Sequence, residues 1–416
     1  MVATALLPFI VFPLAGVLSH RDVAASYGHT MILLLLGGFL LSAAMERSGA
    51  HRRIAVLLVR AVGGRGQRRV VLGFMLATAV LSMWISNTAT TLMMLPIALA
   101  VLDQHKESSL RIPLLLGIAY SASVGGMGTP VGTPPNAMFM GFYEETFGES
   151  LNFIDWMKVA VPIVCILIPL IWWWVTRGLT CDTAFEMPAV GTWRTEEIRV
   201  LVVFAITATA WITRTTPFDG WSQWIGSVDV DGDTKIYVGD ATVGLLASLL
   251  LFIIPSGKGD GDRLLDWPTA EKVPWGILLL FGGGLALAKG FDVSGLSQVI
   301  GQSLAQLTNA PSIVVIGGIC LTVTFLTEIT SGTATTALLL PILASTAKEA
   351  GLPPEMIMIP GTISASCAFM LPVATAPNTI VYSAGGVTTN DMARTGLFLN
   401  FAAAIVITFV CWIMLG

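Results

Sequence analysis

The chain has 416 residues, of which 54% are hydrophobic and only 12% charged, with a formal net charge of −4. Soluble domains carry roughly 25% charged residues, so this composition excludes an ordinary soluble protein. It predicts an all-α polytopic membrane protein with about ten spans, because each crossing of the hydrocarbon core takes about 20 apolar residues. The basic residues lie in short loops without interleaved aromatic side chains, which excludes nucleic acid as an expected partner.

The apolar segments give the expected elements in chain order. They cover residues 4–18, 31–46, 70–102, 111–142, 159–176, 198–213, 236–255, 276–289, 312–347, 357–385 and 396–415. Segments 70–102 and 312–347 are too long for one span and too short for two, and each is interrupted by small polar residues. Since hydrocarbon does not tolerate unpaired backbone groups, each interruption must line a cavity enclosed by protein. We expect re-entrant hairpins at 70–102 and 312–347 and broken helices at 111–142 and 357–385.

Three sequence blocks recur in the same order at nearly constant spacing. ILLLLGG at 32–38 returns as ILLLFGG at 277–283, SNTATTLMMLPI at 86–97 as SGTATTALLLPI at 331–342, and GTPPN at 132–136 as ATAPN at 374–378. The pattern indicates a duplicated half. The first repeat is predicted at 1–197, with the connecting helix 159–176, and the second at 198–416, opening with helix 198–213. The spacing places the counterpart of the helix at 236–251 before residue 1, so at least one helix is expected to be missing from the first half.

Charge orients the two halves. Seven arginines between residues 45 and 70 mark a cytoplasmic segment, whereas the corresponding segment 290–311 contains no Lys or Arg. The repeats are therefore expected to be inverted. Inverted repeats with broken helices near the membrane midplane are typical of secondary transporters.

Four polar segments are expected to meet at that midplane: residues 86–88, 132–136, 331–333 and 374–378. Their hydroxyls and unwound backbone supply the oxygen ligands that sodium binds, and helix N-termini would present N–H groups to an anion. A carboxylate held without Arg or Lys needs positive potential from elsewhere, which bound sodium would supply. The alternative is that Ser, Thr and Gly only permit tight helix packing.

Four motifs resemble the divalent anion/sodium symporter (DASS) family. They are ISNTATTLMMLPI at 85–97, VGTPPN at 131–136, TEITSGTATTALLLPI at 327–342 and LPVATAPNTIVYSAG at 371–385. The resemblance covers nearly the whole chain and implies sodium-coupled import of succinate, malate, fumarate or citrate across the bacterial inner membrane. It also implies a homodimeric elevator, with a scaffold domain, a moving transport domain and two sodium ions per protomer.

The resemblance also implies the site residues. The first sodium site would use Ser82, Ser86, Asn87 and Gly132. The second sodium site would use Thr327, Thr330, Gly332 and Ala374. The carboxylates would contact Asn87, Thr88, Thr133, Ser331, Thr333 and Thr375.

Two residues complicate this assignment. The second tip reads Ser-Gly-Thr where the family has Ser-Asn-Thr, so Gly332 lacks a side-chain oxygen and backbone carbonyls must complete that cation shell. Gly332→Asn is therefore expected to strengthen sodium binding. Glu328 lies inside the second hairpin, where it is either a proton site or the holder of a structural hydrogen bond.

Three functional alternatives to a sodium symporter follow from the same residues. A sodium-independent dicarboxylate exchanger or a transporter of another anion would share the fold, and a channel is a further alternative. The sequence has no GxSxG motif and no metal-ligand spacing, so we do not expect an enzyme.

Overall fold

The computed structural model describes residues 3–63, 66–104, 108–179, 191–216, 220–230, 233–259, 261–296, 299 and 311–416. Over these residues the fold is helical, as predicted, except for one antiparallel hairpin formed by β1 (Ser227–Val230) and β2 (Asp233–Ile236). This hairpin lies in the polar loop 214–235, where valine, threonine and isoleucine alternate with polar residues. That alternation favours strand pairing over a helix.

The first half contains nine helices and two short 3-10 turns within the described residues. They are η1 (Thr4–Leu6), α1 (Leu7–Leu14), α2 (His20–Tyr27), α3 (Thr30–Ser48), α4 (Ala50–Gly63), α5 (Gln67–Ser82), α6 (Asn87–Gln104), η2 (Ser108–Leu110), α7 (Arg111–Gly126), α8 (Pro134–Phe147) and α9 (Phe153–Thr176). The described part of the second half follows a similar order. It contains α10 (Thr195–Ile212), η3 (Trp221–Gln223), the β1–β2 hairpin, α11 (Asp240–Ile253), α12 (Trp267–Ala270), α13 (Trp275–Val293), α15 (Ser312–Ile329), α16 (Gly332–Ala350), α17 (Pro354–Ser364), α18 (Ala376–Ser383) and α19 (Thr389–Leu415).

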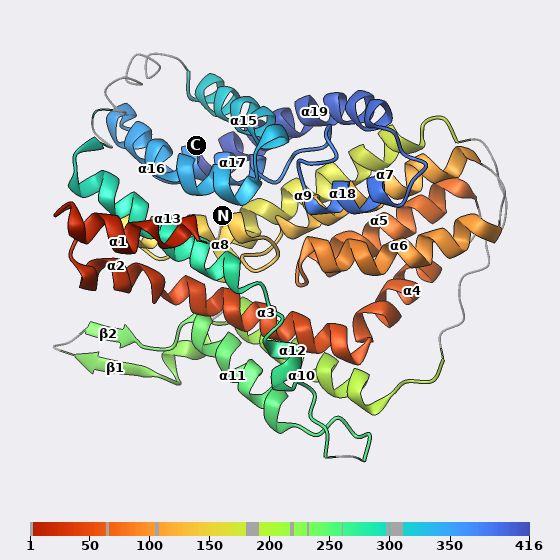
Figure 1. Ribbon diagram of the computed structural model, residues 1–416, viewed down its shortest axis with the longest axis horizontal. Coiled ribbons are helices and arrows are strands. Elements are labelled where there is room, and N and C mark those ends of the chain that lie inside the picture. The colour runs from red at the N-terminus through yellow and green to blue at the C-terminus, as the bar shows by residue number, and fades with distance from the viewer. Residues whose placement is uncertain are drawn as a thin grey trace.

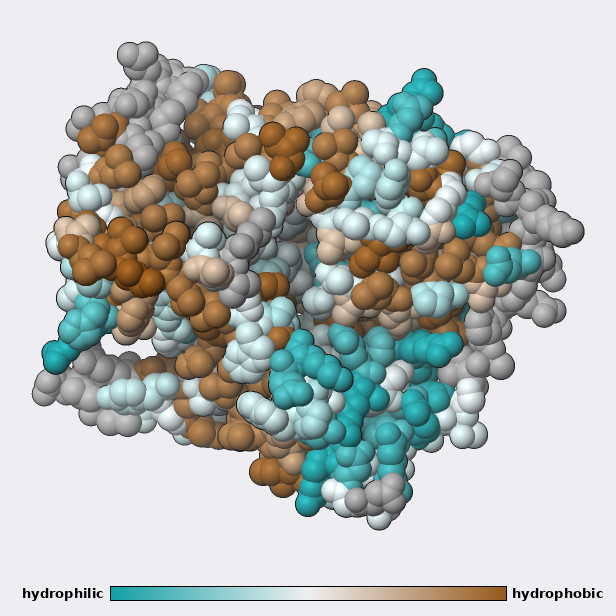
Figure 2. Space-filling view, viewed as in Figure 1, coloured by the Kyte–Doolittle hydropathy of each residue, from teal (hydrophilic) through white to brown (hydrophobic). Residues whose placement is uncertain are grey.

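Within the described part of the chain, five helical segments are long and apolar enough to cross a membrane. They are His20–Ser48, which joins α2 and α3, Phe153–Thr176, Trp275–Val293, Ser312–Ile329 and Thr389–Leu415. On α19, Ile405, Phe409 and Ile413 form an exposed stripe at helical spacing. Figure 2 shows hydrophobic surface over α1 and α13 and a hydrophilic region over α12 and the adjoining end of α3. Large exposed apolar areas of this kind are unfavourable in water and suit a lipid environment.

Local sequence explains where the helices stop. Residues 83–86 separate α5 from α6, and Thr330 and Ser331 separate α15 from α16. The segments 127–133 and 365–375 interrupt what would otherwise be continuous α7–α8 and α17–α18 helices. Proline stands in the first turn of both α8 and α18, where its missing N–H needs no helical partner. Each half therefore carries one helix pair joined at a short tip and one interrupted helix.

Helices of each half pack against helices of the other half. Helix α18 of the second half packs against α6 and α7 of the first, and α8 of the first half packs against α16 and α17 of the second. Figure 1 shows α18 beside α6 and α7, while α15, α16 and α17 lie together at another side of the molecule. This packing brings the tip of each half next to the interrupted helix of the other.

Glycine also allows close contacts between helices elsewhere in the molecule. A Cβ atom on Gly37 of α3 would lie 2.7 Å from the backbone of Gly244 on α11. Small residues at such a crossing let two backbones approach closely, as is common between membrane helices.

Candidate functional site

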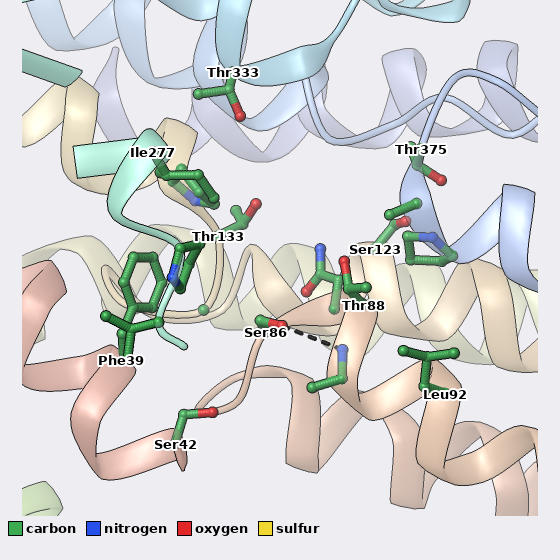
Figure 3. A pocket seen from close by; sticks show the side chains of 18 of the residues that line it. Phe39, Ser42, Ser86, Thr88, Leu92, Ser123, Thr133, Ile277, Thr333 and Thr375 are labelled. Carbon is green, nitrogen blue, oxygen red and sulfur yellow. Dashed lines mark hydrogen bonds between the residues drawn. The ribbon is translucent and has the colours of Figure 1, made fainter. Parts of the chain in front are cut away.

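The four predicted polar segments meet around one cavity of about 980 Å³. Figure 3 shows Ser86 and Thr88 of the first tip, Thr133 of the first interruption, Thr333 of the second tip and Thr375 of the second interruption around this space. All six residues predicted to contact carboxylates line the cavity. They are Asn87, Thr88, Thr133, Ser331, Thr333 and Thr375.

Five of the eight residues predicted to bind sodium also line the cavity, namely Ser86, Asn87, Gly132, Gly332 and Ala374. The other three, Ser82, Thr327 and Thr330, lie behind the tips. The Thr327 hydroxyl donates to the Val323 carbonyl at 2.8 Å, and the Thr330 hydroxyl lies 2.8 Å from the Leu326 carbonyl and 2.5 Å from Thr335 Oγ1.

Helix ends of both kinds converge on the cavity. Helices α6, α8, α16 and α18 begin at Asn87, Pro134, Gly332 and Ala376, all of which line it. Their N-termini direct N–H groups and positive dipole ends toward an anion. Helices α5, α7, α15 and α17 end beside the same segments, where their last carbonyls are oxygen donors for a cation. The backbone alone therefore offers sites for both charges.

Side-chain and backbone oxygens gather at the first tip. Ser82 Oγ lies 2.6 Å from Asn87 Oδ1 and 2.7 Å from the Ala122 carbonyl oxygen. A Cβ atom on Gly126 would lie 2.3 Å from Asn87 Oδ1, and one on Gly132 would lie 2.5 Å from the Gly126 carbonyl oxygen. Both glycines are required because the chain passes directly against these oxygens. Hydroxyl, amide and carbonyl oxygens are the ligands that hard cations prefer.

The second tip is built differently. A Cβ atom on Gly332 would lie 2.4 Å from the Ala365 carbonyl oxygen. Gly332 does not have a positive φ, so its backbone conformation does not by itself require glycine. Residue 332 is therefore glycine because a backbone carbonyl occupies the space that an asparagine side chain would enter.

Two asparagines hold the helix interruptions open. Asn136 Nδ2 donates to the carbonyls of Gly126, Met127 and Thr129 at 3.1, 3.3 and 2.7 Å. Asn378 Nδ2 donates to two carbonyls of the second interruption, those of Ala368 and Leu371, both at 3.0 Å. These bonds satisfy carbonyls that lose their helical partners where each helix stops. The duplicated GTPPN and ATAPN motifs pointed to both residues, but their amides had no assigned role.

The structure supports the structural role of Glu328. This buried carboxylate accepts hydrogen bonds from the Met370 and Leu371 backbone N–H groups at 2.8 and 2.9 Å. It also accepts one from Asn400 Nδ2 at 2.7 Å. These three bonds anchor the second interruption to α15 and α19, which is the structural role that the sequence analysis gave as one of two alternatives for Glu328.

The cavity is also lined by ionisable residues that the sequence analysis did not predict to lie there. Glu46, Arg47, His51 and Lys272 line it. Arg47 forms ion pairs of 2.7 Å with Asp262 and Asp266, so its charge is largely balanced. Burial lowers the pKa of His51, although its hydrogen bond to the Met45 carbonyl opposes that shift. In the sequence Arg47 served only as a mark of orientation, because nothing local shows that α3 ends at a cavity.

A cavity lined by hydroxyl and amide groups and by helix N-termini, in a molecule with apolar helices of membrane length, is typical of a multi-pass membrane transporter for a small charged solute. The chain belongs to the citrate transporter family CitMHS, whose family model matches residues 1–358. Its predicted resemblance to the divalent anion/sodium symporters is confirmed, as is the prediction that the chain is not an enzyme.

Two similar proteins carry the name sodium-dependent dicarboxylate transporter SdcS. The one from Staphylococcus saprophyticus is 38% identical over 435 residues, covering 99% of this chain and 82% of that protein. The one from Staphylococcus aureus is 36% identical over 433 residues, covering 99% of this chain and 81% of that protein.

The fold is also similar to the crystal structure of the Alcanivorax borkumensis YdaH transporter. The TM-score is 0.66 at 13% identity, with 94% of this chain and 86% of that chain covered.

Proposed function

We propose that this protein is a secondary active transporter that imports C4-dicarboxylates such as succinate, malate and fumarate, or citrate, together with sodium across a bacterial inner membrane. The observation that carries the proposal is that four helix N-termini line one cavity and that four helix C-termini end beside the same polar segments. N–H groups stabilise carboxylates and carbonyls stabilise sodium, so the same backbone geometry suits both solutes. The printed names of the similar staphylococcal proteins support both the ion and the class of substrate.

Coupling follows from the low fixed charge of the inner site. The residues at the tips and interruptions are neutral, so a dianion entering there needs positive potential from another source. Sodium held by oxygens at each tip would supply that potential within a few ångströms of the substrate. We assign one sodium ion to each tip, which gives two per protomer.

The decisive experiment is uptake of radiolabelled succinate and citrate into proteoliposomes, with an inward sodium gradient compared with an equal potassium gradient. The proposal expects accumulation only with sodium. Uptake of equal size in both salts, stimulated by internal dicarboxylate, would identify a sodium-independent exchanger instead. Parallel uptake of radiolabelled sodium measures the stoichiometry, and the proposal expects two or more sodium ions for each substrate.

The proposal includes inverted repeats with two re-entrant hairpins, α5–α6 and α15–α16. It can be tested at corresponding loops of the two halves, since Ser150 precedes α9 and Thr389 begins α19, and both are exposed. In a background without reactive native cysteines, Ser150→Cys and Thr389→Cys should react with an impermeant thiol reagent from opposite sides of the membrane. Labelling of both from one side would contradict the inverted topology.

The proposal further includes a homodimer that works as an elevator. The mass of the protein in detergent, corrected for bound detergent, tests the dimer. Different cross-linking between α8 and α13 with and without sodium and succinate tests relative motion, because these two helices are in contact in the structure.

A further inference from the structure

A short motif that the sequence analysis did not assign is duplicated beside the tips. Ser121, Ala122 and Ser123 lie near the end of α7, and Ser364, Ala365 and Ser366 lie at the end of α17. The first copy lies within the last turns of α7, just before the first interruption, and the second copy runs from Ser364, the last residue of α17, into the second interruption. The middle residues already have a place in the site, because the Ala122 carbonyl accepts from Ser82 and the Ala365 carbonyl lies against Gly332.

The last serine of each copy has a buried hydroxyl without a hydrogen-bond partner in the described part of the chain. Ser123 is 2% exposed and Ser366 is 7% exposed, and neither Oγ atom is paired. A buried hydroxyl without a partner is unfavourable. Hydroxyls on helices usually avoid this state by donating to the carbonyl four residues earlier, as Thr362 does in α17.

Both unpaired hydroxyls belong to residues that line the central cavity. Figure 3 shows Ser123 among the side chains around this cavity, together with Thr88 and Thr375, which are two of the residues assigned to carboxylate binding. Ser121 and Ser364, the first serines of the two copies, also have unpaired hydroxyls, but they are fully buried and do not line the cavity. What distinguishes Ser123 and Ser366 is therefore their place in the wall of the space that the solute would occupy.

We propose that Ser123 and Ser366 are a pair of hydroxyl donors to the transported dianion, one from each half of the chain. The inference rests on the proposed function and adds two substrate-binding residues to it. An anion needs donors, and a hydroxyl that bonds neither its own helix nor a neighbour is free to donate when the anion arrives. Because the two hydroxyls come from different halves, they suit a small solute with two separate carboxylates.

Serine-to-alanine variants test this directly, because alanine favours helix and removes only the oxygen. In purified protein with saturating sodium, Ser123→Ala and Ser366→Ala should each weaken binding of radiolabelled succinate about tenfold, the expected loss of a hydrogen bond to a charged group. The double variant should lose about 100-fold if the two hydroxyls act independently. Binding of radiolabelled sodium without substrate should stay unchanged. Ser121→Ala and Ser364→Ala are matched controls and should bind succinate as the unmodified protein does.

Four other results would overturn the inference. Unchanged succinate affinity in Ser123→Ala and Ser366→Ala would show that the hydroxyls do not touch substrate. Equal losses in the Ser121→Ala and Ser364→Ala controls would indicate helix packing, and weaker sodium binding without substrate would make the hydroxyls cation ligands. If the unmodified protein binds neither succinate nor citrate in sodium, the proposed function itself fails and the inference fails with it.

Discussion

The two tips of this protein both gather oxygen atoms, but the atoms come from different groups. At the first tip, Asn87 contributes a side-chain amide oxygen beside Ser82. At the second, Gly332 contributes no side chain, and the Ala365 carbonyl approaches instead. Duplicated segments can therefore keep an oxygen-rich surface while exchanging a side-chain oxygen for a backbone oxygen.

The two interruptions beside the tips share one feature and differ in another. In both, an asparagine amide binds exposed carbonyls, through Asn136 in the first half and Asn378 in the second. Only the second adds a buried carboxylate, Glu328, which accepts from backbone N–H groups. The position corresponding to Glu328 in the first tip is Met83. The second half thus depends on one charged side chain where the first depends on neutral groups alone.

The largest expected effect comes from removing the Glu328 carboxylate. Glu328→Ala should leave two backbone donors and the Asn400 amide buried without an acceptor, lowering stability by at least about 3 kcal/mol. We expect a large fall in the melting temperature of the detergent-solubilised protein and no sodium-driven uptake. Met83→Ala, at the corresponding position of the first tip, serves as the control. Equal loss in both variants would show that the two halves do not differ in this respect.

The next largest effect concerns Gly332. The sequence alone predicted that Gly332→Asn would strengthen sodium binding, but the structure predicts the opposite because even a Cβ atom would lie 2.4 Å from the Ala365 oxygen. Overpacking of this kind costs about 1–3 kcal/mol. Gly332→Ala and Gly332→Asn should both weaken sodium-dependent succinate binding. Tighter sodium-dependent succinate binding in Gly332→Asn would contradict this prediction and support the expectation from sequence that the second tip lacks only an amide.

A similar effect is expected at the matching position of the first tip. Asn87→Ala removes the amide oxygen beside Ser82 and leaves that buried hydroxyl with one partner fewer, at a cost of about 1–3 kcal/mol. Sodium-driven succinate uptake should fall about tenfold while expression and oligomeric state persist. Asn87→Gly would reproduce the second tip in the first half. Succinate uptake by Asn87→Gly would be normal only if the Ala122 carbonyl oxygen shifted into the space left by the Asn87 side chain, so that it lay against residue 87 as the Ala365 carbonyl lies against Gly332.

The smallest expected effect lies at the rim of the cavity, where the first half has His51 and the corresponding position of the second half is Leu296. Burial lowers the pKa of His51 in the folded state. The unfolded chain therefore binds a proton first as the pH falls below about 6.5, and stability decreases from there down to the folded pKa. We expect a loss under about 1 kcal/mol between pH 7.5 and pH 5.5 that is reduced in His51→Gln. The same pH dependence of melting temperature in both proteins would exclude His51 as its source.

Most of the helical plan could be predicted from local sequence. Apolar length predicted where most helices lie, and prolines with small polar residues predicted the interruptions near Thr133 and Thr375. About ten spans were expected, but only five of the described helical segments are long and apolar enough to cross a membrane, because several apolar segments form shorter helices. The duplicated motifs also named the ten predicted residues that line the cavity. The short β1–β2 hairpin was the exception, because its alternating pattern is only four residues long in each strand.

What the sequence determined by itself was the set of segments that cannot lie in hydrocarbon, since helix breaks and missing hydrophobicity are local properties of the chain. The tertiary structure alone decided which atoms those segments face. The crossing of α8 with α16 and of α18 with α6 joins residues that are far apart in the sequence. Packing within the second half, of α16 against α17 and of α15 against α19, brings the Ala365 carbonyl to Gly332 and three donors to Glu328. The crossing of the two halves brings Ser123 and Ser366 to one cavity. Side-chain chemistry at these positions depends on partners that no sequence pattern within one helix specifies.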